Sequence, residues 1–157
     1  MMRIAAVLCC AGVLAGCAFF KSVRENHESR QVLDLIGYAQ KIAALQAEEQ
    51  RRELNASSQM FSKERDAYSR VRLALLLALP GTAFNDDAKA AGLLEPLAGA
   101  EAAESSPGPM QQFAGLLHAQ ISERLREQRR TVQLKEQLEA LKAIERKIIE
   151  REQARPK

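Results

Sequence analysis

The sequence predicts an all-α protein with antiparallel helical hairpins followed by one long C-terminal helix. Two observations carry this prediction. Only 4% of the 157 residues are aromatic and none is Trp, while Ala, Leu, Glu, Gln and Arg are abundant, and this composition favours helix over sheet. Beyond residue 28, apolar residues also recur at spacings of three and four, the period of an amphipathic helix.

Residues 1–16 are predicted to be an export signal. A basic start, Met1-Met2-Arg3, precedes an apolar run over residues 4–15. That run is too short to span a bilayer, which requires about 20 apolar residues. It ends in Leu14-Ala15-Gly16-Cys17, which resembles the lipoprotein box of bacteria. The resemblance implies cleavage after Gly16, diacylglycerol transfer to the Cys17 sulfur and acylation of the new amino terminus. The alternative is a soluble secreted protein with a cysteine at its cleavage site.

Cysteine content and charge exclude several classes of site. Cys9 and Cys10 lie inside the predicted signal, so Cys17 is the only cysteine expected after cleavage, and acylation uses it. The processed monomer could therefore form neither a disulfide nor a cysteine metal site. The net charge of +3 falls to +2 when Arg3 leaves with the signal. This value is too small to argue for a nucleic-acid partner.

Residues 17–28 are predicted to be a tether between the lipid and the fold, because no helical period follows Phe20. The residue after Cys17 is Ala18 and not Asp. In the lipoproteins of enteric bacteria, Asp at this position retains the protein in the inner membrane. Its absence here implies an outer-membrane anchor with the fold facing the periplasm.

Residues 29–104 are predicted to be a helical domain. Its first helix is expected to begin at Ser29 as the N-cap and to use a stripe of apolar residues. These are Val32, Leu35, Ile36, Ala39, Ile42, Ala43 and Leu45. The following stretch is more polar, and Asn55-Ala56-Ser57-Ser58 could interrupt it. The sequence therefore leaves open whether residues 46–79 form one helix or two.

The segment from Arg70 to Leu79 is apolar on nearly every face, which is typical of a helix packed in an interior. Pro80-Gly81 is expected to end it. Asn85 or Asp86 should cap a further helix over residues 88–98, with Pro96 near its end. Because helices joined by so short a turn lie roughly antiparallel, the pair resembles a tetratricopeptide hairpin, although no 34-residue repeat is present.

Residues 105–109 read Ser-Ser-Pro-Gly-Pro and are predicted to be a linker. One long helix over residues 110–153 should follow, with a short tail over 154–157. Its early apolar stripe is expected to pack on the helical domain, and consists of Leu117, Ile121, Leu125 and Val132.

A second stripe on this helix has the heptad spacing of a coiled coil and is displaced from the first. It consists of Leu134, Leu138, Leu141 and Ile148, and Glu145 occupies one of its core positions. We expect this stripe to bind another chain, either a second copy or a different protein. A basic cluster precedes it, made of Arg124, Arg126, Arg129 and Arg130. The cluster is expected to be a solvated face, with anionic lipid or an acidic protein as alternative contacts.

No motif for catalysis or cofactor binding is present in the sequence. It lacks a nucleophile elbow, a phosphate loop, a zinc motif and a dinucleotide fingerprint. His27 and His118 have no Cys or carboxylate at metal-ligand spacing, and Asp86-Asp87 is better explained by helix capping than by a catalytic dyad. We therefore expect a protein that is not an enzyme and that uses no cofactor, metal or small-molecule substrate.

Three segments together resemble the outer-membrane lipoproteins of the quorum-sensing regulator protein G type. They are the lipoprotein box at Cys17, the run from Arg70 to Phe84, and residues 138–146. The resemblance implies a periplasmic accessory protein that engages the sensor region of a membrane histidine kinase in two-component signalling. The alternative is a structural or assembly lipoprotein that holds envelope proteins on a helical scaffold. Neither function requires catalysis.

Overall fold

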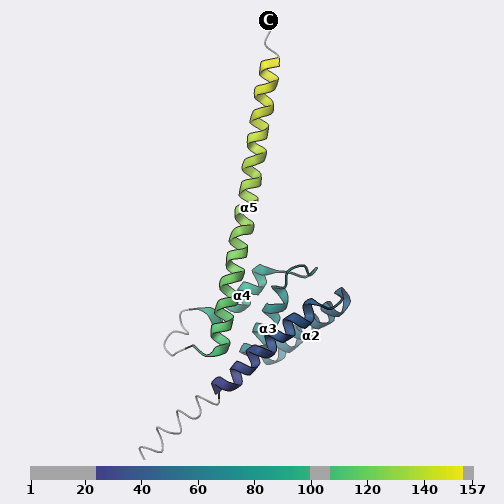
Figure 1. Ribbon diagram of the computed structural model, residues 1–157, viewed down its shortest axis with the longest axis vertical. Coiled ribbons are helices and arrows are strands. Elements are labelled where there is room, and N and C mark those ends of the chain that lie inside the picture. The colour runs from purple at the N-terminus through teal and green to yellow at the C-terminus, as the bar shows by residue number, and fades with distance from the viewer. Residues whose placement is uncertain (1–23, 100–106, 154–157) are drawn as a thin grey trace, which may run out of the picture. The chain divides into compact units, whose positions relative to one another are not determined.

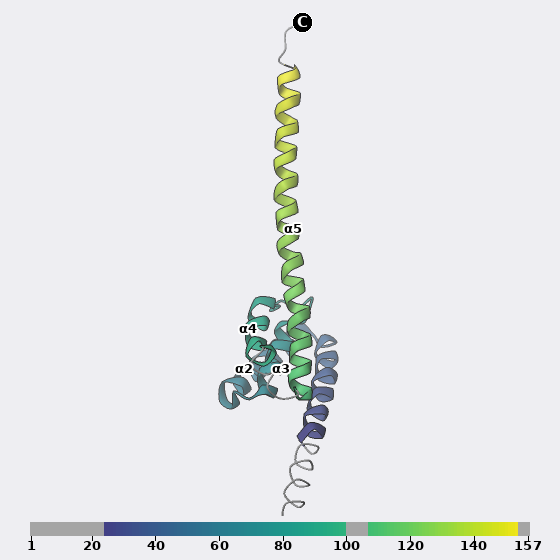
Figure 2. The same cartoon turned by 90° about the vertical axis from the view of Figure 1, so that its left-hand side faces the viewer.

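The computed structural model describes residues 24–99 and 107–153. Within these ranges the chain consists of helices joined by turns and short loops, and it contains no strand (Figures 1 and 2). The predicted all-α class and the long C-terminal helix are therefore confirmed. The chain divides into two compact units, Met1–Ile121 and Ser122–Lys157. We call the first the helical domain.

The first helix of the described part of the chain covers residues 24–43. Ser29 is therefore not an N-cap as predicted, and its hydroxyl instead donates to the Glu25 carbonyl at 2.7 Å, four residues back. Residues 24–28, assigned to the tether from their polarity, are already helical. An ion pair of 3.0 Å between Arg24 and Glu28 supports this turn. The spacing of apolar residues alone therefore predicts a start for this helix that is several residues too late.

Residues 46–79 contain two helices and not one. Helix α2 covers Ala47–Glu64 without interruption at residues 55–58, and α3 covers Ala67–Leu77. The break lies at Arg65, whose φ of 51° is left-handed, a conformation that ends a helix. Asp66 then caps α3, because its side chain accepts a hydrogen bond of 2.8 Å from the Ser69 backbone.

The core of the helical domain is built around α3, which packs against both α2 and α4 (Asp87–Ala98). Its residues Val71, Leu73, Ala74, Leu76 and Leu77 are all buried, which confirms the expected interior position. Further buried side chains come from the other helices of this unit. They are Leu35, Ile42, Ala90, Leu94, Met110, Ala114 and Ile121.

The turn between α3 and α4 uses both polar residues proposed as caps, in different roles. Helix α4 covers Asp87–Ala98, and Asp86 is its N-cap, with the carboxylate accepting from the Lys89 backbone at 2.9 Å. The Asn85 side chain points back and donates to the Leu77 carbonyl at 3.0 Å. It thereby satisfies a carbonyl at the end of α3 that has no partner within its own helix.

Removing the Asp86 cap should weaken the helical domain. Asp86→Ala leaves the Lys89 N–H without its acceptor, and we expect the free energy of unfolding to fall by about 0.5–2 kcal/mol in urea titrations. Lys89→Ala is the matched control, because it keeps the backbone donor and removes only an exposed side chain. Equal losses for the two variants would show that the cap contributes nothing.

Helix α5 covers Pro109–Gln153 and passes through the boundary between the two units. Its first turns belong to the helical domain, because Met110, Ala114 and Ile121 are buried in the core. The boundary between the two compact units therefore lies after Ile121, inside α5. Of the predicted linker over residues 105–109, residues 105 and 106 lie outside the described residues, and Pro109 is the first residue of α5. None of the helices in the described ranges is long and apolar enough to cross a membrane.

Candidate interaction surface

The part of α5 in the second unit exposes a continuous apolar stripe. The four predicted partner-binding residues lie on it, with exposed fractions of 65% for Leu134, 51% for Leu138, 63% for Leu141 and 51% for Ile148. Their spacing of four, three and seven keeps them on one face of the helix. The structure thus brings together all four residues at an exposed face, and what binds there stays a prediction.

Two further isoleucines widen this stripe and were missed in the sequence. Ile144 is 55% exposed and Ile149 is 45% exposed. Ile144 follows Leu141 by three residues and precedes Ile148 by four, so the same spacing signal could have identified it. We define the α5 seam by six residues. They are Leu134, Leu138, Leu141, Ile144, Ile148 and Ile149.

The early stripe of α5 serves as core only in part. Ile121 is fully buried and Leu117 is half-buried, as expected for residues that complete the helical domain. Val132 is 55% exposed, so its predicted packing on the domain is wrong. Side chains described beyond Leu125 are exposed on every face of the helix. Spacing alone could not show where along α5 burial stops.

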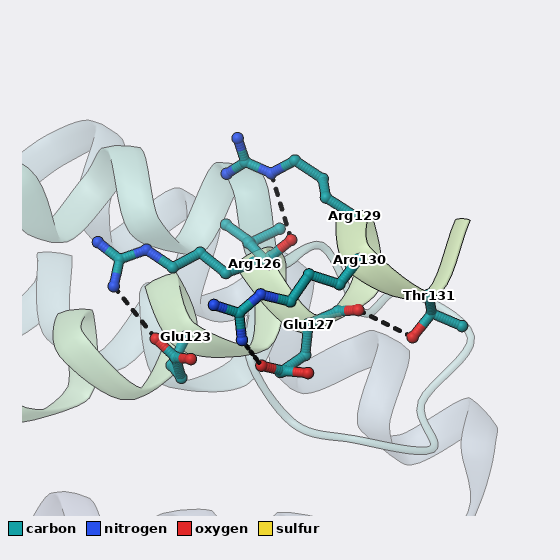
Figure 3. Close-up of polar contacts among 7 residues, drawn as sticks. Glu123, Arg126, Glu127, Arg129, Arg130 and Thr131 are labelled. Atoms are coloured by element: carbon teal, nitrogen blue, oxygen red, sulfur yellow. Dashed lines mark hydrogen bonds and ion pairs between the residues drawn. The ribbon is translucent and has the colours of Figure 1, made fainter. Parts of the chain in front are cut away.

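Three members of the basic cluster, Arg126, Arg129 and Arg130, are exposed and make contacts within the helix (Figure 3), while Arg124 is half-buried. Arg126 pairs with Glu123 at 3.1 Å, and Arg130 pairs with Glu127 at 2.5 Å. The Arg129 side chain donates to a backbone carbonyl one turn earlier, at 3.3 Å. Such exposed pairs contribute only a few tenths of a kcal/mol each. They favour a solvated helix over a preformed anion site.

A polar cluster inside the helical domain joins three helices. The Tyr38 hydroxyl donates to the Glu53 carboxylate at 2.9 Å and lies 3.2 Å from the Ser57 hydroxyl. Arg72 donates to Ser57 at 3.0 Å and to Glu53 at 3.4 Å, and its guanidinium lies 4.1 Å from the centre of the Tyr38 ring. These contacts connect residues 24–43 with α2 and α3. The partners stabilise one another, so we assign the cluster a structural role.

Burial raises the pKa of the Tyr38 phenol, and its hydrogen bond to Glu53 adds to this effect, against the smaller opposing influence of Ser57 and Arg72. A raised pKa in the folded state means that folding favours the protonated phenol. The corresponding stability is fully present below the ordinary pKa of about 10. It is lost as the pH rises through the raised value.

Tyr38→Phe should therefore destabilise the helical domain in a pH-dependent way. At pH 8 we expect a loss of about 1 kcal/mol in the free energy of unfolding, because one hydrogen bond to a carboxylate is removed. Above pH 10 the difference between the wild type and the variant should shrink, since only the wild type then has this phenol to ionise. Urea titrations at several pH values measure both, with Tyr68→Phe as the matched control. A difference independent of pH would contradict the prediction.

Both histidines of the sequence lie within the described ranges. His118 is half-buried and His27 is exposed. Within residues 24–99 and 107–153, no group of three or more His, Cys, Asp or Glu is arranged to hold a metal ion. Gly16 and Cys17 lie outside the described residues, so cleavage and lipidation stay predictions from the sequence.

Comparison with known proteins adds no relative. No family model matches the chain, and no curated protein or solved structure is significantly similar to it.

Proposed function

We propose that this protein is a non-catalytic, lipid-anchored accessory protein of the bacterial envelope that binds a helical partner through the α5 seam. The observation that carries this proposal is the seam itself, where six aliphatic side chains on one helix are each at least 45% exposed. Contiguous exposed apolar surface usually marks an interaction site. Heptad spacing suits a second helix laid along the first.

The partner we propose is the helical sensor region of a membrane histidine kinase. Support comes from the resemblance of three segments to the quorum-sensing regulator protein G type, at Cys17, residues 70–84 and residues 138–146. In this proposal the Cys17 lipid anchors the protein in the outer membrane, facing the periplasm. Helices α3 and α4 act as a tetratricopeptide-like hairpin within a stable domain, and α5 pairs with the kinase as a coiled coil.

A structural or assembly scaffold is the second candidate. It is favoured by the length of exposed helix, because residues 122–153 extend about 48 Å at about 1.5 Å per residue. Such a helix could hold several envelope proteins along its face. Genes for a kinase and a response regulator next to the gene for this protein would favour signalling over the scaffold.

Photo-cross-linking in the bacterial envelope tests the proposed partner directly. A photoreactive amino acid at Leu141 should cross-link to the kinase sensor region. The same group at Ala143 should not, because it is exposed but lies about 160° away around the helix. Equal cross-linking from both positions would show that the seam does not select the kinase. Cross-links from Leu141 to other envelope proteins alone would favour the scaffold.

Lipid anchoring has its own test. Cys17→Ser removes the sulfur that receives diacylglycerol, so we expect no fatty-acid label in the protein and loss of the anchored form from outer-membrane fractions. Metabolic labelling and membrane fractionation measure these two effects. Cys10→Ser is the matched control, since it lies within the predicted signal and should leave labelling unchanged. Wild-type labelling of the Cys17→Ser chain would disprove lipidation at this residue.

A further inference from the structure

The charged residues that flank the α5 seam all have the same sign. In heptad terms Leu134, Leu141 and Ile148 occupy d positions, so Lys135 and Lys142 occupy the flanking e positions. Arg130 and Arg151 occupy the flanking g positions on the other side. The face opposite the seam carries charges of both signs, with Glu136, Glu139 and Glu150 beside Arg129, Arg146 and Lys147. The remaining e and g positions are Gln137, Ile144 and Ile149, so every charged residue that flanks the apolar stripe is a cation.

These flanking cations are accessible to a partner. Lys135, Lys142, Arg130 and Arg151 are all exposed. Lys142 pairs with Glu139 at 2.9 Å and Arg130 pairs with Glu127, but both are exposed pairs three residues apart. Such pairs are weak, so they leave most of the positive charge available to a carboxylate across an interface.

A second copy of this chain fits the seam poorly. In a parallel pair, Arg130 at g would face Lys135 at e of the other copy, and Glu145 would face Glu145 in the core. In an antiparallel pair, Lys135 would face Lys142. Among the flanking positions of the parallel pair, only Ile144 at g of one copy and Ile149 at e of the other would make a favourable contact. Like charges in these positions oppose self-association.

A lipid surface also fits the seam less well than a protein helix. Glu145 lies at the centre of the apolar stripe, where insertion into lipid would remove water from its carboxylate at a high free-energy cost. Helices that lie in membrane interfaces usually carry Trp or Phe on their apolar face. The sequence contains no aromatic residue after Phe113.

We propose that the α5 seam binds an amphipathic helix whose own apolar seam is flanked by Asp and Glu. This inference rests on the proposed function and specifies the chemistry of the partner. Carboxylates at the partner's e and g positions would pair with Lys135, Lys142 and Arg151. A Lys or Arg at the core position opposite Glu145 would neutralise the carboxylate within the seam. The charges thus select against self-pairing while the aliphatic residues supply the binding energy.

Two synthetic peptides of four heptads test this inference with the full-length protein in detergent micelles. Both carry Leu at a and d, with one Lys placed to face Glu145. One has Glu at every e and g position, and the other has Lys there. Fluorescence anisotropy should show at least about tenfold tighter binding of the Glu peptide at low salt. The ratio should fall as the salt concentration rises.

A charge reversal in the protein gives the sharper result. Lys135→Glu combined with Lys142→Glu should weaken binding of the Glu peptide and strengthen binding of the Lys peptide. The matched control is Arg129→Glu combined with Lys147→Glu, which makes the same charge change at exposed positions away from the seam. The control should keep the preference of the wild type. Inversion in the first variant and not in the control would establish the flanks as the source of selectivity.

Other outcomes overturn the inference in distinguishable ways. Equal binding of both peptides, independent of salt, would disprove the charge preference and leave the helix-binding function standing. Displacement of the Glu peptide by phosphatidylglycerol vesicles would reassign the seam to a lipid surface. Failure of both peptides to bind a self-associated chain would identify a second copy as the occupant. Failure to bind a monomeric chain would contradict the proposed function as well.

Discussion

Leu76→Ala is expected to lower the free energy of unfolding of the helical domain by about 2–5 kcal/mol. The Leu76 side chain has no exposed surface and lies on α3, the helix that packs against both α2 and α4. Truncation removes three carbons from the core and leaves a cavity that the neighbouring helices can fill only in part. A loss of this size is a large fraction of the stability of a typical domain.

Urea titrations followed by circular dichroism measure this loss. Leu116→Ala is the matched control, because Leu116 is also helical but is 60% exposed. The control should change the free energy of unfolding by no more than about 0.5 kcal/mol. If Leu76→Ala were no more damaging than the control, α3 would not be the centre of the core.

The α3–α4 region could be predicted from sequence because its signals are local. The apolar run to Leu79 and the stop at Pro80-Gly81 act through nearest neighbours along the chain. The same holds for the Asp86 cap, whose acceptor and donor are three residues apart at 2.9 Å. Local patterns of this kind favour the same local structure regardless of how distant parts of the chain pack.

The break between α2 and α3 shows where local reasoning fails. Arg65 adopts a left-handed conformation although neither Gly nor Pro is near it, and the sequence around it is compatible with helix. The suspected break at residues 55–58 does not occur, and Ser57 is buried in a hydrogen-bonded cluster instead. Asp66 followed by Ser69 was the available signal, since an Asp cap marks a helix start.

The polar cluster could not be predicted because its members are far apart in sequence. Tyr38 meets Glu53 and Ser57 at separations of 15 and 19 residues, and each pair exists only after the helices pack. No motif links them. The α5 seam is the opposite case, since its heptad spacing is visible in sequence while its exposure is known only from the fold.

Leu138→Asp combined with Leu141→Asp is expected to abolish binding of the helical partner without unfolding the helical domain. The two leucines are 51% and 63% exposed, so carboxylates there stay in contact with water in the free protein. In the complex each leucine would bury its side chain, which contributes roughly 1.5–3 kcal/mol. Loss of both should weaken binding at least about a hundredfold. Cross-linking or pull-down of the kinase sensor region measures this effect beside thermal melting.

The control for this variant is Val132→Asp combined with Ala143→Asp, which adds the same two charges to the same helix at exposed positions on the face opposite the seam. It should bind and melt like the wild type. If the leucine variant instead unfolded the whole protein, the seam would be internal core and α5 would fold back in solution. If it melted normally and still bound every partner, the seam would not be the interface. The basic cluster, in which Arg126 and Arg130 hold only exposed ion pairs, would then be the next surface to replace.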